Sequence, residues 1–480
     1  MVIADIIEAL TDNRIEARQP ITQVVIDSRQ AEQDSLFVAL PGENSDGHEF
    51  VEQAFRQGAT VALTHRPVEL SVPHQHIKVD EPLPQTIDPN QPLCIETSDS
   101  LVGLQQFAKF WRQKFDVRVV AITGSVGKST TKELTASVLS TRYNLLKSEG
   151  NYNNEIGLPL TLLNLTSAHE RVVLEMGMYD LGEITLLCEL AQPHVGVVTN
   201  VGPVHLERLG TIERIAQAKT ELVSALPPYN SQTKSVAILN YDDPYVRGMV
   251  PKTKAAVMSY GLTPSADLWA SDVTSAGLDG IRFVFNQGTD TIHARVPLLG
   301  RHSVHTALRA ALVGLVEGLA WGDIITGLQN LPAKDQLRLV WIPGPNGSIL
   351  LDDSYNANPA STIAALNMLD DLSAPKKIAV LGDMLELGHM EEAGHRKVGC
   401  RAARVVDLLI TIGDRAQIIA EEAEACGLNS SKIIQLPDNQ AAIDLLEAQL
   451  AQNEIVLIKG SNSQKMDQIV SNLTRRSISE

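Results

Sequence analysis

One loop constrains the fold of this chain more than any other feature, because it joins a hydrophobic segment to a helix-like segment through small residues. The segment VRVVAIT precedes the loop and a helical pattern follows it. The backbone N–H groups of such a loop can approach phosphate oxygens, a lysine can neutralise phosphate charge, and a hydroxyl can hold Mg²⁺. We therefore predict that the loop binds the phosphates of ATP. Its residues are Gly124, Ser125, Val126, Gly127, Lys128, Ser129 and Thr130.

The loop has the spacing GxxGKS, which departs from the strict G-x4-G-K-[ST] pattern because Ile122 stands six residues before Lys128. A glycine turn before a helix is the alternative interpretation. The strand-like segment, the lysine and the two hydroxyls together favour phosphate binding. Taken alone, the loop is equally compatible with a nucleotide-driven switch or a transport ATPase.

Strand-like and helix-like patterns alternate along the 480 residues, which predicts an α/β fold. Division by about 150 residues per domain suggests three domains. We expect a small N-terminal α/β module at residues 1–95, a central P-loop-type domain with a mostly parallel sheet at residues 96–335, and a C-terminal Rossmann-like doubly wound domain at residues 336–480. Residues 265–297 have strand-like spacing with Gly-containing turn signals, which indicates a small antiparallel appendage.

The expected elements follow hydrophobic runs and periodic segments. Residues 66–94 contain six prolines among polar residues, so we expect a boundary or an inserted loop there. The last domain has no GxGxxG after its first strand, which makes a dinucleotide site unlikely. Helices are expected in MVIADIIEALTDNR, in EFVEQAFRQG and at residues 101–114. Strands are expected at ITQVVID, LFVAL, ATVALT, VRVVAIT, RVVLEMG, HVGVVTN, SVAILN, SILLDD, KIAVLG, DLLITIG and EIVLIKG.

Composition narrows the class of partner and the compartment. The net charge is -17 and no block of lysine and arginine is present, which argues against nucleic acid as the main partner. No apolar run approaches the roughly 18 residues that cross a bilayer, so membrane insertion is not expected. The cysteines are far apart and form no CxxC pair, so neither a zinc site nor a disulfide framework is favoured. This pattern fits a reducing compartment, and we expect a cytoplasmic protein. They are Cys94, Cys188, Cys400 and Cys426.

Three further residues have functional and structural interpretations. Glu175 ends the apolar run VVLE, which places a carboxylate at the carboxyl edge of a sheet, where Mg²⁺ and ligands bind, although such an acid is more often a cap or a surface group. His205, in TNVGPVHLERLG, is on its own more often structural or solvent-facing. Lys219, in ERIAQAKTELV, is on its own more often a solvated lysine.

Taken together, these segments resemble the Mur ligase family, and the C-terminal third brings the likeness closer. The segments DDSYNANPAS, LGDMLELG and KGS occupy residues 352–361, 381–388 and 459–461. Near the N-terminus, the run DSR and the segment LFVALPGENSDGHEF are similar to the UDP-binding module of the family. The combination looks most like the members that add D-Ala-D-Ala to UDP-N-acetylmuramoyl-tripeptide. The resemblance spans nearly the whole chain and is weakest at residues 66–91.

The resemblance implies a ligase that phosphorylates the terminal carboxylate of UDP-N-acetylmuramoyl-tripeptide with ATP. The amine of D-Ala-D-Ala then attacks the acyl phosphate, which is the last cytoplasmic step in the synthesis of the peptidoglycan pentapeptide precursor. ATP and two Mg²⁺ ions are the implied cofactors. A monomer without nucleic acid partners is expected.

The resemblance also implies roles for single residues. Lys128, Lys219, His205 and Glu175 are the implied catalytic residues. The implied Mg²⁺ ligands are Ser129, Glu175 and His205, together with Lys219 if CO₂ carbamylates it. Contacts to ATP beyond the loop are implied for His302, Ser303, Thr306, Arg338, Asp353 and Asn356. Substrate contacts are implied for Ser28, Arg29, Asp46, His48, Asn151, Asn153, Asn154 and Asn358.

Some of these residues have plain structural alternatives or depart from the family pattern. The asparagines of GNYNNEIG can be turn and cap residues, and Asp353 and Asn356 can form the turn after SILLDD. The family segment G-x-H-N-x-x-N has Ser303 and Thr306 in place of asparagines, and a shorter hydroxyl reaches less far toward adenine. KGSN stands where KGSR is common. A ligase that adds another amino acid, such as a diamino-acid-adding Mur ligase or a folylpolyglutamate synthetase, remains an alternative.

Overall fold

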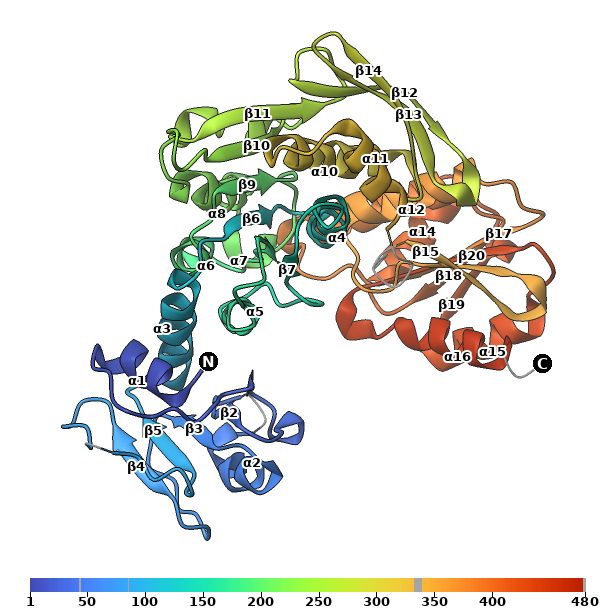
Figure 1. Cartoon of the computed structure of the whole chain (residues 1–480). Helices are drawn as coiled ribbons and strands as arrows, with labels where there is room; N and C mark the ends of the chain where they lie inside the picture. The colour runs from blue at the N-terminus through green and yellow to red at the C-terminus, as the bar shows by residue number, and fades with distance from the viewer. Residues whose placement is uncertain (43–44, 85, 332–338, 478–480) are drawn as a thin grey trace. The chain divides into compact units, whose positions relative to one another are not determined.

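The computed structural model describes residues 1–42, 45–84, 86–331 and 339–477, which form alternating helices and strands (Figure 1). Contacts within the chain define two compact units. The first unit contains residues 1–121, 143–177 and 182–194, and the second contains residues 122–142, 178–181 and 195–480. The predicted α/β class is confirmed.

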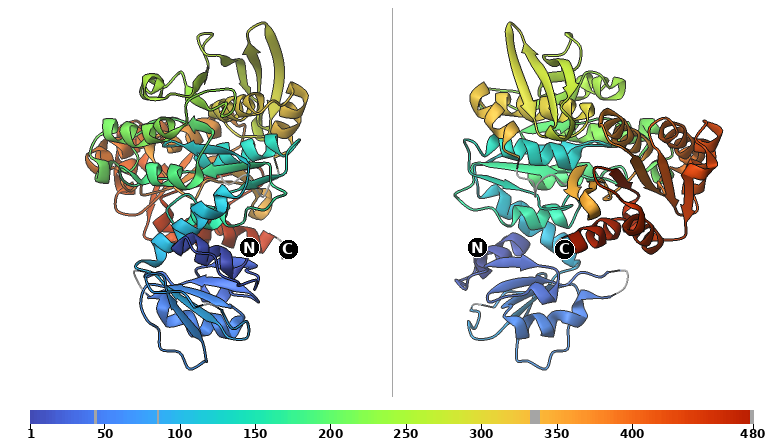
Figure 2. Two further views of the ribbon diagram at one scale, coloured as in Figure 1. Left: turned by 60° about the vertical axis from the view of Figure 1, so that its left-hand side comes forward. Right: turned by 90° about the vertical axis from the view of Figure 1, so that its right-hand side faces the viewer.

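The first unit contains a five-stranded sheet in the order β1-β2-β3-β5-β4, in which every neighbouring pair is parallel. The sheet is drawn in blue in Figure 2. Helix α2 (Val51–Gln57) packs its apolar side chains against Phe37 and Ala62 of this sheet. The strands are β1 (Gln23–Val25), β2 (Ser35–Val38), β3 (Val61–Thr64), β4 (Gln75–Lys78) and β5 (Leu93–Glu96).

The expectation of irregular structure throughout residues 66–94 is wrong at β4. The prolines flank this strand rather than interrupt it, since Pro73 lies before it and Pro82 after it. Strand β4 is also at the edge of the sheet, where a proline beside the strand removes no ladder hydrogen bond. Proline content alone therefore does not exclude an edge strand.

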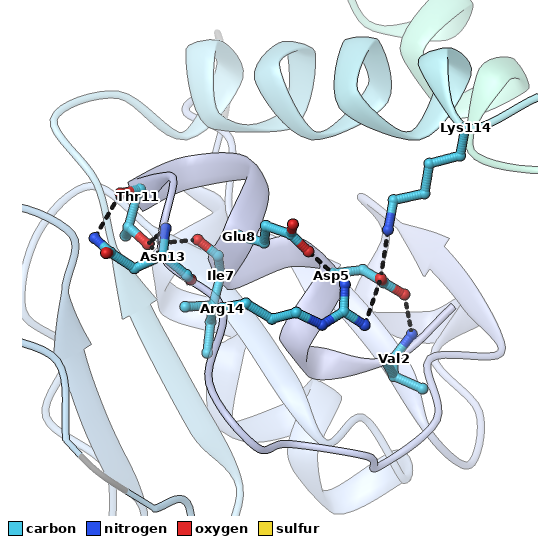
Figure 3. A network of polar contacts seen from close by, with 8 residues as sticks. All are labelled: Val2, Asp5, Ile7, Glu8, Thr11, Asn13, Arg14 and Lys114. Atoms are coloured by element: carbon cyan, nitrogen blue, oxygen red, sulfur yellow. Dashed lines mark hydrogen bonds and ion pairs between the residues drawn. The ribbon is translucent and has the colours of Figure 1, made fainter.

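Helix α1 (Ile3–Thr11) is the amphipathic helix expected at the N-terminus, and a polar network ties it to the end of α3 (Ser100–Gln113) (Figure 3). Lys114 Nζ donates to Asp5 Oδ1 at 2.8 Å, and the backbone N–H of Val2 donates to Asp5 Oδ2 at 2.8 Å. Arg14 forms an ion pair with Glu8 at 2.6 Å. Because Asp5 is buried, its pairing with Lys114 fixes the position of α1 against α3.

The remainder of the first unit includes strand β8 (Arg171–Glu175), which ends at the carboxylate of Glu175. Strand β7 (Leu145–Lys147) pairs in parallel with β8. Helices α5 (Gly157–Leu162) and α6 (Glu183–Ala191) pack with α3. Strand β6 (Arg118–Thr123) begins in this unit, and its last two residues belong to the second unit.

The second unit contains a run of strands in the order β14-β13-β12-β11-β10-β9. Pairing is parallel from β9 to β12 and antiparallel from β12 to β14, so the predicted antiparallel appendage is confirmed. Helices α10 (Val304–Val316) and α11 (Trp321–Gln329) pack against α4 (Lys128–Leu139). The strands are β9 (Val195–Val198), β10 (Val236–Asn240), β11 (Ala256–Gly261), β12 (Leu268–Ser275), β13 (Ile281–Gln287) and β14 (Asp290–Val296).

The C-terminal part of the second unit is a doubly wound sheet in the order β15-β16-β20-β17-β18-β19, parallel except for the pair β15–β16. Two separate apolar clusters cover its faces, one with α12, α13 and α14 and the other with α15 and α16 (Figure 1). The predicted Rossmann-like domain is confirmed. Its strands are β15 (Val340–Pro343), β16 (Ile349–Asp352), β17 (Lys377–Gly382), β18 (Leu408–Ile412), β19 (Ile433–Leu436) and β20 (Ile455–Lys459). Its helices are α12 (Pro359–Asp371), α13 (Glu391–Ala402), α14 (Ala416–Ala425), α15 (Asn439–Gln449) and α16 (Asp467–Ser477).

The cysteines form no disulfide framework across the described residues, but one pair departs from that expectation: Cys400 and Cys426 form a disulfide with a Cα–Cα distance of 5.2 Å. Cys400 lies near the carboxyl end of α13 and Cys426 directly follows α14. Parallel strands joined by right-handed crossovers make neighbouring helices run in the same direction, so the ends of these two helices meet. Cys94 and Cys188 are buried and form no disulfide. Across the described ranges, no helix is long and apolar enough to cross a membrane.

Candidate functional site

The glycine loop leaves the carboxyl end of β6 and leads directly into α4. Gly124 has φ 144°, and a Cβ there would lie 1.8 Å from Oγ1 of Thr199, so only glycine fits. Gly127 has φ 83° and precedes the first residue of the helix. Lys128 curls back over the loop and donates from Nζ to the carbonyl of Gly124 at 2.9 Å. The N–H groups of the first helical turn and a lysine thus lie at one place, as phosphate binding requires.

Residues that follow β9 hold the loop in this shape. The N–H of Val126 donates to Asn200 Oδ1 at 2.9 Å, and Thr199 Oγ1 donates to the Val126 carbonyl at 2.7 Å. Ser125 Oγ accepts from the N–H of Gly202 at 2.8 Å. Sequence reasoning assigned no role to Thr199 or Asn200, although both end the expected strand HVGVVTN. Ser125 and Val126 support the loop through these contacts.

Lys219 lies in α8 (Ile212–Ala225) and is only 2% exposed. Burial lowers the pKa of Lys219 well below its usual value, and the nearby charge of Lys128 lowers it further. Within the described part of the chain, no carboxylate pairs with Lys219, and no acidic side chain offsets these two effects on its pKa. Burial and the Lys128 charge both favour the neutral form of the Lys219 amine, which is the form that can react as a nucleophile.

A buried arginine lies beneath the loop, and sequence reasoning missed it. Arg309, in α10, donates from Nη2 to Thr306 Oγ1 at 2.8 Å and from Nη1 to the Tyr260 hydroxyl at 3.3 Å. A Cβ on Gly127 would lie 3.2 Å from Arg309 Nη2. Its only sequence signal is a single charge within the apolar helix VHTALRAALVGLV. Arg309 thus places a fixed positive charge close to the start of α4.

The three residues expected near adenine differ in their surroundings. Ser303 is buried and donates from Oγ to the carbonyl of Leu299 at 2.7 Å. The hydroxyl of Thr306 accepts from Arg309. His302 is exposed. Both short hydroxyls therefore have partners inside the protein, while His302 remains available to a ligand.

In the first unit, Glu175 ends β8 and is 3% exposed. Its Oε1 accepts from Asn153 Nδ2 at 2.9 Å, and among the described residues its Oε2 has no hydrogen-bond partner. An unpartnered buried carboxylate oxygen is costly unless a cation or water binds it. Glu175 therefore fits the donor chemistry of a Mg²⁺ ligand.

The other asparagines of this loop have structural contacts. Asn154 Oδ1 accepts from the N–H of Gly157 at 2.9 Å, just inside α5. The carbonyl of Asn151 accepts from the N–H of Asn153 at 2.7 Å. The alternative of turn and cap asparagines thus describes the contacts of Asn151 and Asn154, whereas the Asn153 side chain contacts Glu175.

His205 contacts a residue of the segment LGDMLELG. Its Nδ1 lies 2.6 Å from Glu386 Oε2, and the N–H of Leu206 donates to the Glu386 carbonyl at 3.1 Å. The hydrogen bond from His205 lowers the pKa of Glu386, which keeps that carboxylate ionised. Sequence reasoning missed Glu386 because its partner lies 181 positions away. A cavity of about 340 Å³ adjoins this pair, lined by Tyr179, His205, Glu207, Arg208 and Glu386.

The three C-terminal motifs converge within their domain. Lys459 of KGS is buried, pairs with Asp353 Oδ2 at 2.6 Å and donates to the Asn356 carbonyl at 2.8 Å. Ser461 Oγ accepts from the N–H of Leu385 in LGDMLELG at 2.9 Å. Asp353 is thus bound to a buried lysine, which the turn interpretation did not foresee. Arg338 lies outside the described residues.

Two asparagines of DDSYNANPAS stabilise local backbone. Asn358 caps α12, since its Oδ1 accepts from the N–H of Ser361 at 2.9 Å. Asn356 Oδ1 accepts from the N–H of Ala357 at 2.9 Å. These contacts place both residues at the amino end of α12, after the strand β16 that precedes them.

The N-terminal candidates follow the carboxyl ends of parallel strands. Asp46 lies 2.6 Å from Nδ1 of the buried His48 and pairs with Arg66 at 2.8 Å. The backbone N–H of His48 and the Arg66 guanidinium hold the pKa of Asp46 far below its usual range. Nε2 of His48 accepts from the N–H of His65 at 3.1 Å. Arg66 and His65 are additional residues at this edge that sequence reasoning did not single out.

Ser28 and Arg29 follow β1 at the same edge of this sheet. Ser28 Oγ donates to Gln53 Oε1 at 3.2 Å. Arg29 forms an ion pair with Asp27 at 2.7 Å, and its side chain is 79% exposed. Such an exposed pair is weak, so the Arg29 guanidinium can turn toward an anionic ligand at little cost.

No three His, Cys, Asp or Glu side chains in the described ranges cluster as a metal site by themselves. Mg²⁺ commonly binds through one or two carboxylates plus water and substrate phosphates, so it does not require such a cluster.

Comparisons with known proteins match the chain along most of its length. The Mur ligase family, catalytic domain matches residues 20–101. The Mur ligase middle domain matches residues 122–314, and the Mur ligase, glutamate ligase domain matches residues 337–462.

Similar full-length proteins share one name. The chain is 34% identical over 479 residues to a UDP-N-acetylmuramoyl-tripeptide--D-alanyl-D-alanine ligase of Bacillus subtilis, which covers 99% of this chain and 98% of the relative. A crystal structure of MurF from Acinetobacter baumannii matches with a TM-score of 0.82 and 28% identity over 98% of each chain. A MurF ligase from Thermotoga maritima in complex with ADP matches with a TM-score of 0.77 and 25% identity, again over 98% of each chain.

Proposed function

The chain belongs to the Mur ligase family, and we propose that it joins D-alanyl-D-alanine to UDP-N-acetylmuramoyl-tripeptide at the expense of ATP. The observation that carries this proposal is the end-to-end similarity to a relative named for that activity. The glycine loop supports it, because Lys128, Arg309 and the start of α4 gather positive charge where ATP phosphates would bind.

The reaction proceeds through an acyl phosphate. A carboxylate oxygen of the tripeptide attacks the γ-phosphorus of ATP, and ADP leaves. The dipeptide amine then attacks the acyl carbon, phosphate leaves with the carboxyl oxygen, and the amine loses a proton. An amine does not displace oxide from a free carboxylate, whereas phosphate is a good leaving group. Positioning and neutralisation of phosphate charge supply most of the catalysis in such a transfer.

Several residues are assigned to phosphate and metal. The loop from Gly124 to Thr130 binds the ATP phosphates, with Lys128 as the mobile cation. Ser129 and Glu175 are assigned as ligands of one Mg²⁺ and His205 as a ligand of a second. The unpartnered Oε2 of Glu175 supports its assignment. Bound Mg²⁺ would neutralise charge on the phosphate oxygens.

Lys219 is assigned as a lysine that CO₂ carbamylates. A neutral amine adds to CO₂ and releases a proton, which yields an N-carboxylate. The lowered pKa of Lys219, due to burial and then to Lys128, keeps the amine in that reactive form. The resulting anion would balance the cationic Lys128 and could act as a cation ligand.

The domains receive separate tasks in this proposal. Residues 1–95 bind the UDP-sugar end through Ser28, Arg29, Asp46 and His48. Residues 96–335 bind ATP and carry Asn151, Asn153 and Asn154 near the substrate. Residues 336–480 close on the nucleotide, with contacts from Arg338, Asp353 and Asn356, and bind the dipeptide through Asn358. Closure excludes water, which would otherwise hydrolyse the acyl phosphate.

We also infer a cytoplasmic monomer, since both ATP and a UDP-linked precursor are cytoplasmic substrates. In that reducing compartment, the disulfide between Cys400 and Cys426 is expected to be reduced to two thiols. Crosslinking and mass spectrometry of the protein from intact cells test both statements. A substantial dimer fraction or an oxidised pair would contradict them.

Phosphate release with a panel of acceptors tests the proposed function. We expect release only when UDP-N-acetylmuramoyl-tripeptide and D-Ala-D-Ala are both present, with tripeptides that end in lysine or diaminopimelate compared separately. Release with neither substrate would favour a switch or transport ATPase. Release with single amino acids and a shorter UDP-linked acceptor would favour another amino-acid-adding ligase.

A further inference from the structure

Glu386 forms a hydrogen bond with one ring nitrogen of His205, Nδ1. Glu386 Oε2 lies 2.6 Å from His205 Nδ1, and within the described residues Nε2 of His205 has no hydrogen bond. When Nδ1 donates its hydrogen to the Glu386 carboxylate, Nε2 is the ring nitrogen left to offer a lone pair to a cation.

The backbone around His205 and Glu386 brings the two side chains together. His205 and Glu386 both adopt left-handed conformations, with φ 55° and φ 63°, which is uncommon for residues other than glycine. The N–H of Leu206 donates to the Glu386 carbonyl at 3.1 Å. A Cβ on Gly388 would lie 3.2 Å from Cα of Glu207, so the two loops approach backbone to backbone.

The His205 ring is also held from a second direction. Tyr179 packs edge-on against it, with ring centroids 4.9 Å apart and an interplanar angle of 71°. The carboxylate and the aromatic ring together leave the imidazole little freedom to rotate. Two loops and a third segment therefore define one orientation of His205.

We propose that Glu386 is a positioning residue, which fixes the tautomer and the ring orientation of His205 so that Nε2 is ready to bind a divalent cation. Imidazole is a weak ligand for Mg²⁺, which prefers oxygen. A carboxylate on the other ring nitrogen raises ligand basicity and fixes orientation, and this pairing is widespread among metal-binding histidines. The inference rests on the proposed function, because it takes His205 as a cation ligand.

The contact between His205 and Glu386 links a residue of the central domain to a residue of the C-terminal domain. His205 follows β9 of the central domain, whereas Glu386 follows β17 of the C-terminal domain. The orientation of His205 therefore depends on contact between these two domains. The segment LGDMLELG, to which sequence reasoning assigned no separate role, thereby acquires one.

Binding of Mn²⁺ to the full-length protein with ADP, followed by electron paramagnetic resonance, tests the proposal without turnover. Glu386→Ala is expected to weaken Mn²⁺ binding by about 10-fold or more. Glu386→Gln is expected to lose less, because its amide oxygen still accepts from Nδ1. Glu207→Gln is the matched control: it removes a carboxylate from the same cavity, without a hydrogen bond to His205, and should bind Mn²⁺ within about twofold of wild type.

The double variant His205→Ala/Glu386→Ala separates positioning from other roles. If Glu386 acts through His205, the double variant binds Mn²⁺ no more weakly than His205→Ala alone. A further loss in the double variant, or equal losses for Glu386→Ala and Glu207→Gln, would overturn the proposal. Circular dichroism of each variant checks folding, and Glu386→Gln, which is isosteric with the wild-type residue, remains informative if the alanine variant unfolds.

Two outcomes distinguish this inference from the function on which it rests. Weaker binding in His205→Ala with no change in Glu386→Ala overturns the positioning role alone. Unchanged binding in His205→Ala removes the ligand role of His205 and the inference with it. The acceptor-panel assay reports on ligase activity independently of both.

Discussion

At the scale of single residues, three positions of the candidate site have features that are unusual in a folded protein. Gly124 admits no Cβ, Lys219 is buried without a carboxylate partner among the described residues, and Glu175 has an unpartnered oxygen. The last two features cost stability when nothing binds there, because a buried amine and a buried carboxylate oxygen then lack polar partners. Both are expected if CO₂ binds at Lys219 and a cation binds at Glu175, as proposed.

Gly124→Ala is expected to weaken nucleotide binding, because its Cβ would lie 1.8 Å from Thr199 Oγ1 and displace the strand end that holds the loop. Isothermal titration with ADP measures the effect, and we expect at least a 10-fold loss of affinity, about 1.4 kcal/mol. Gly288→Ala is the control, since Gly288 also has positive φ but a Cβ there would meet no atom within 4 Å. Equal nucleotide affinities in the two variants would contradict this explanation.

Lys219→Ala is expected to lower kcat by at least 100-fold and to recover partly with a short carboxylic acid, which replaces the carbamate anion. Wild-type activity should also fall when CO₂ and bicarbonate are removed, because the neutral Lys219 amine binds CO₂ reversibly. Steady-state phosphate release measures both effects. Lys252→Ala, at an exposed lysine, is the control. Full activity of Lys219→Ala without added acid would refute the carbamate.

Local chemistry was predictable at this scale, and long-range partners were not. The loop from Gly124 to Thr130 was evident because its residues are consecutive. Arg309 and Glu386 were missed because their partners are distant in the sequence: Arg309 contacts Tyr260 from 49 positions away and Glu386 contacts His205 from 181. A sequence pattern records neighbours along the chain and not those that folding brings together.

At the scale of elements, strand ends supply most of the candidate residues. The glycine loop follows β6, Glu175 ends β8, and Asn200 follows β9. Long hydrophobic runs predicted these strands because both of their faces are buried. Strands β15 and β19 were missed because both are edge strands that are only partly buried, so their sequences carry a weaker pattern.

Asn358 has a structural role and a proposed ligand role that mutation can separate. Asn358→Ala is expected to lower the free energy of unfolding by about 1 kcal/mol, because the cap of α12 is lost, whereas Asn358→Asp keeps the cap and the stability. If Asn358 also binds the dipeptide, both variants raise KM for D-Ala-D-Ala. Urea denaturation and dipeptide titration measure the two effects. A KM for D-Ala-D-Ala that stays at the wild-type value in Asn358→Asp would contradict the ligand role and leave helix capping as the role of Asn358.

At the scale of the whole molecule, the C-terminal domain is the part that the sequence described least fully. Its alternation of strands and helices was correctly predicted, and DDSYNANPAS, LGDMLELG and KGS were recognised as separate motifs. Their convergence around the buried pair of Lys459 and Asp353 follows from the strand order β16-β20-β17, which places three segments from different parts of the chain side by side. That order is a property of the folded sheet rather than of any one segment.

The pairing of Cys400 with Cys426 predicts a stability that depends on the redox state. The two residues are 26 positions apart, and closing a loop of this length stabilises a protein by about 3.5 kcal/mol in the chain-entropy account. Thermal melts of the oxidised wild type and of Cys400→Ser/Cys426→Ser should therefore differ, with the variant melting several degrees lower. With excess reductant the two melting temperatures should converge, since both chains then lack the crosslink. A difference that persists in reductant would mean that the thiols contribute through packing between α13 and α14 instead.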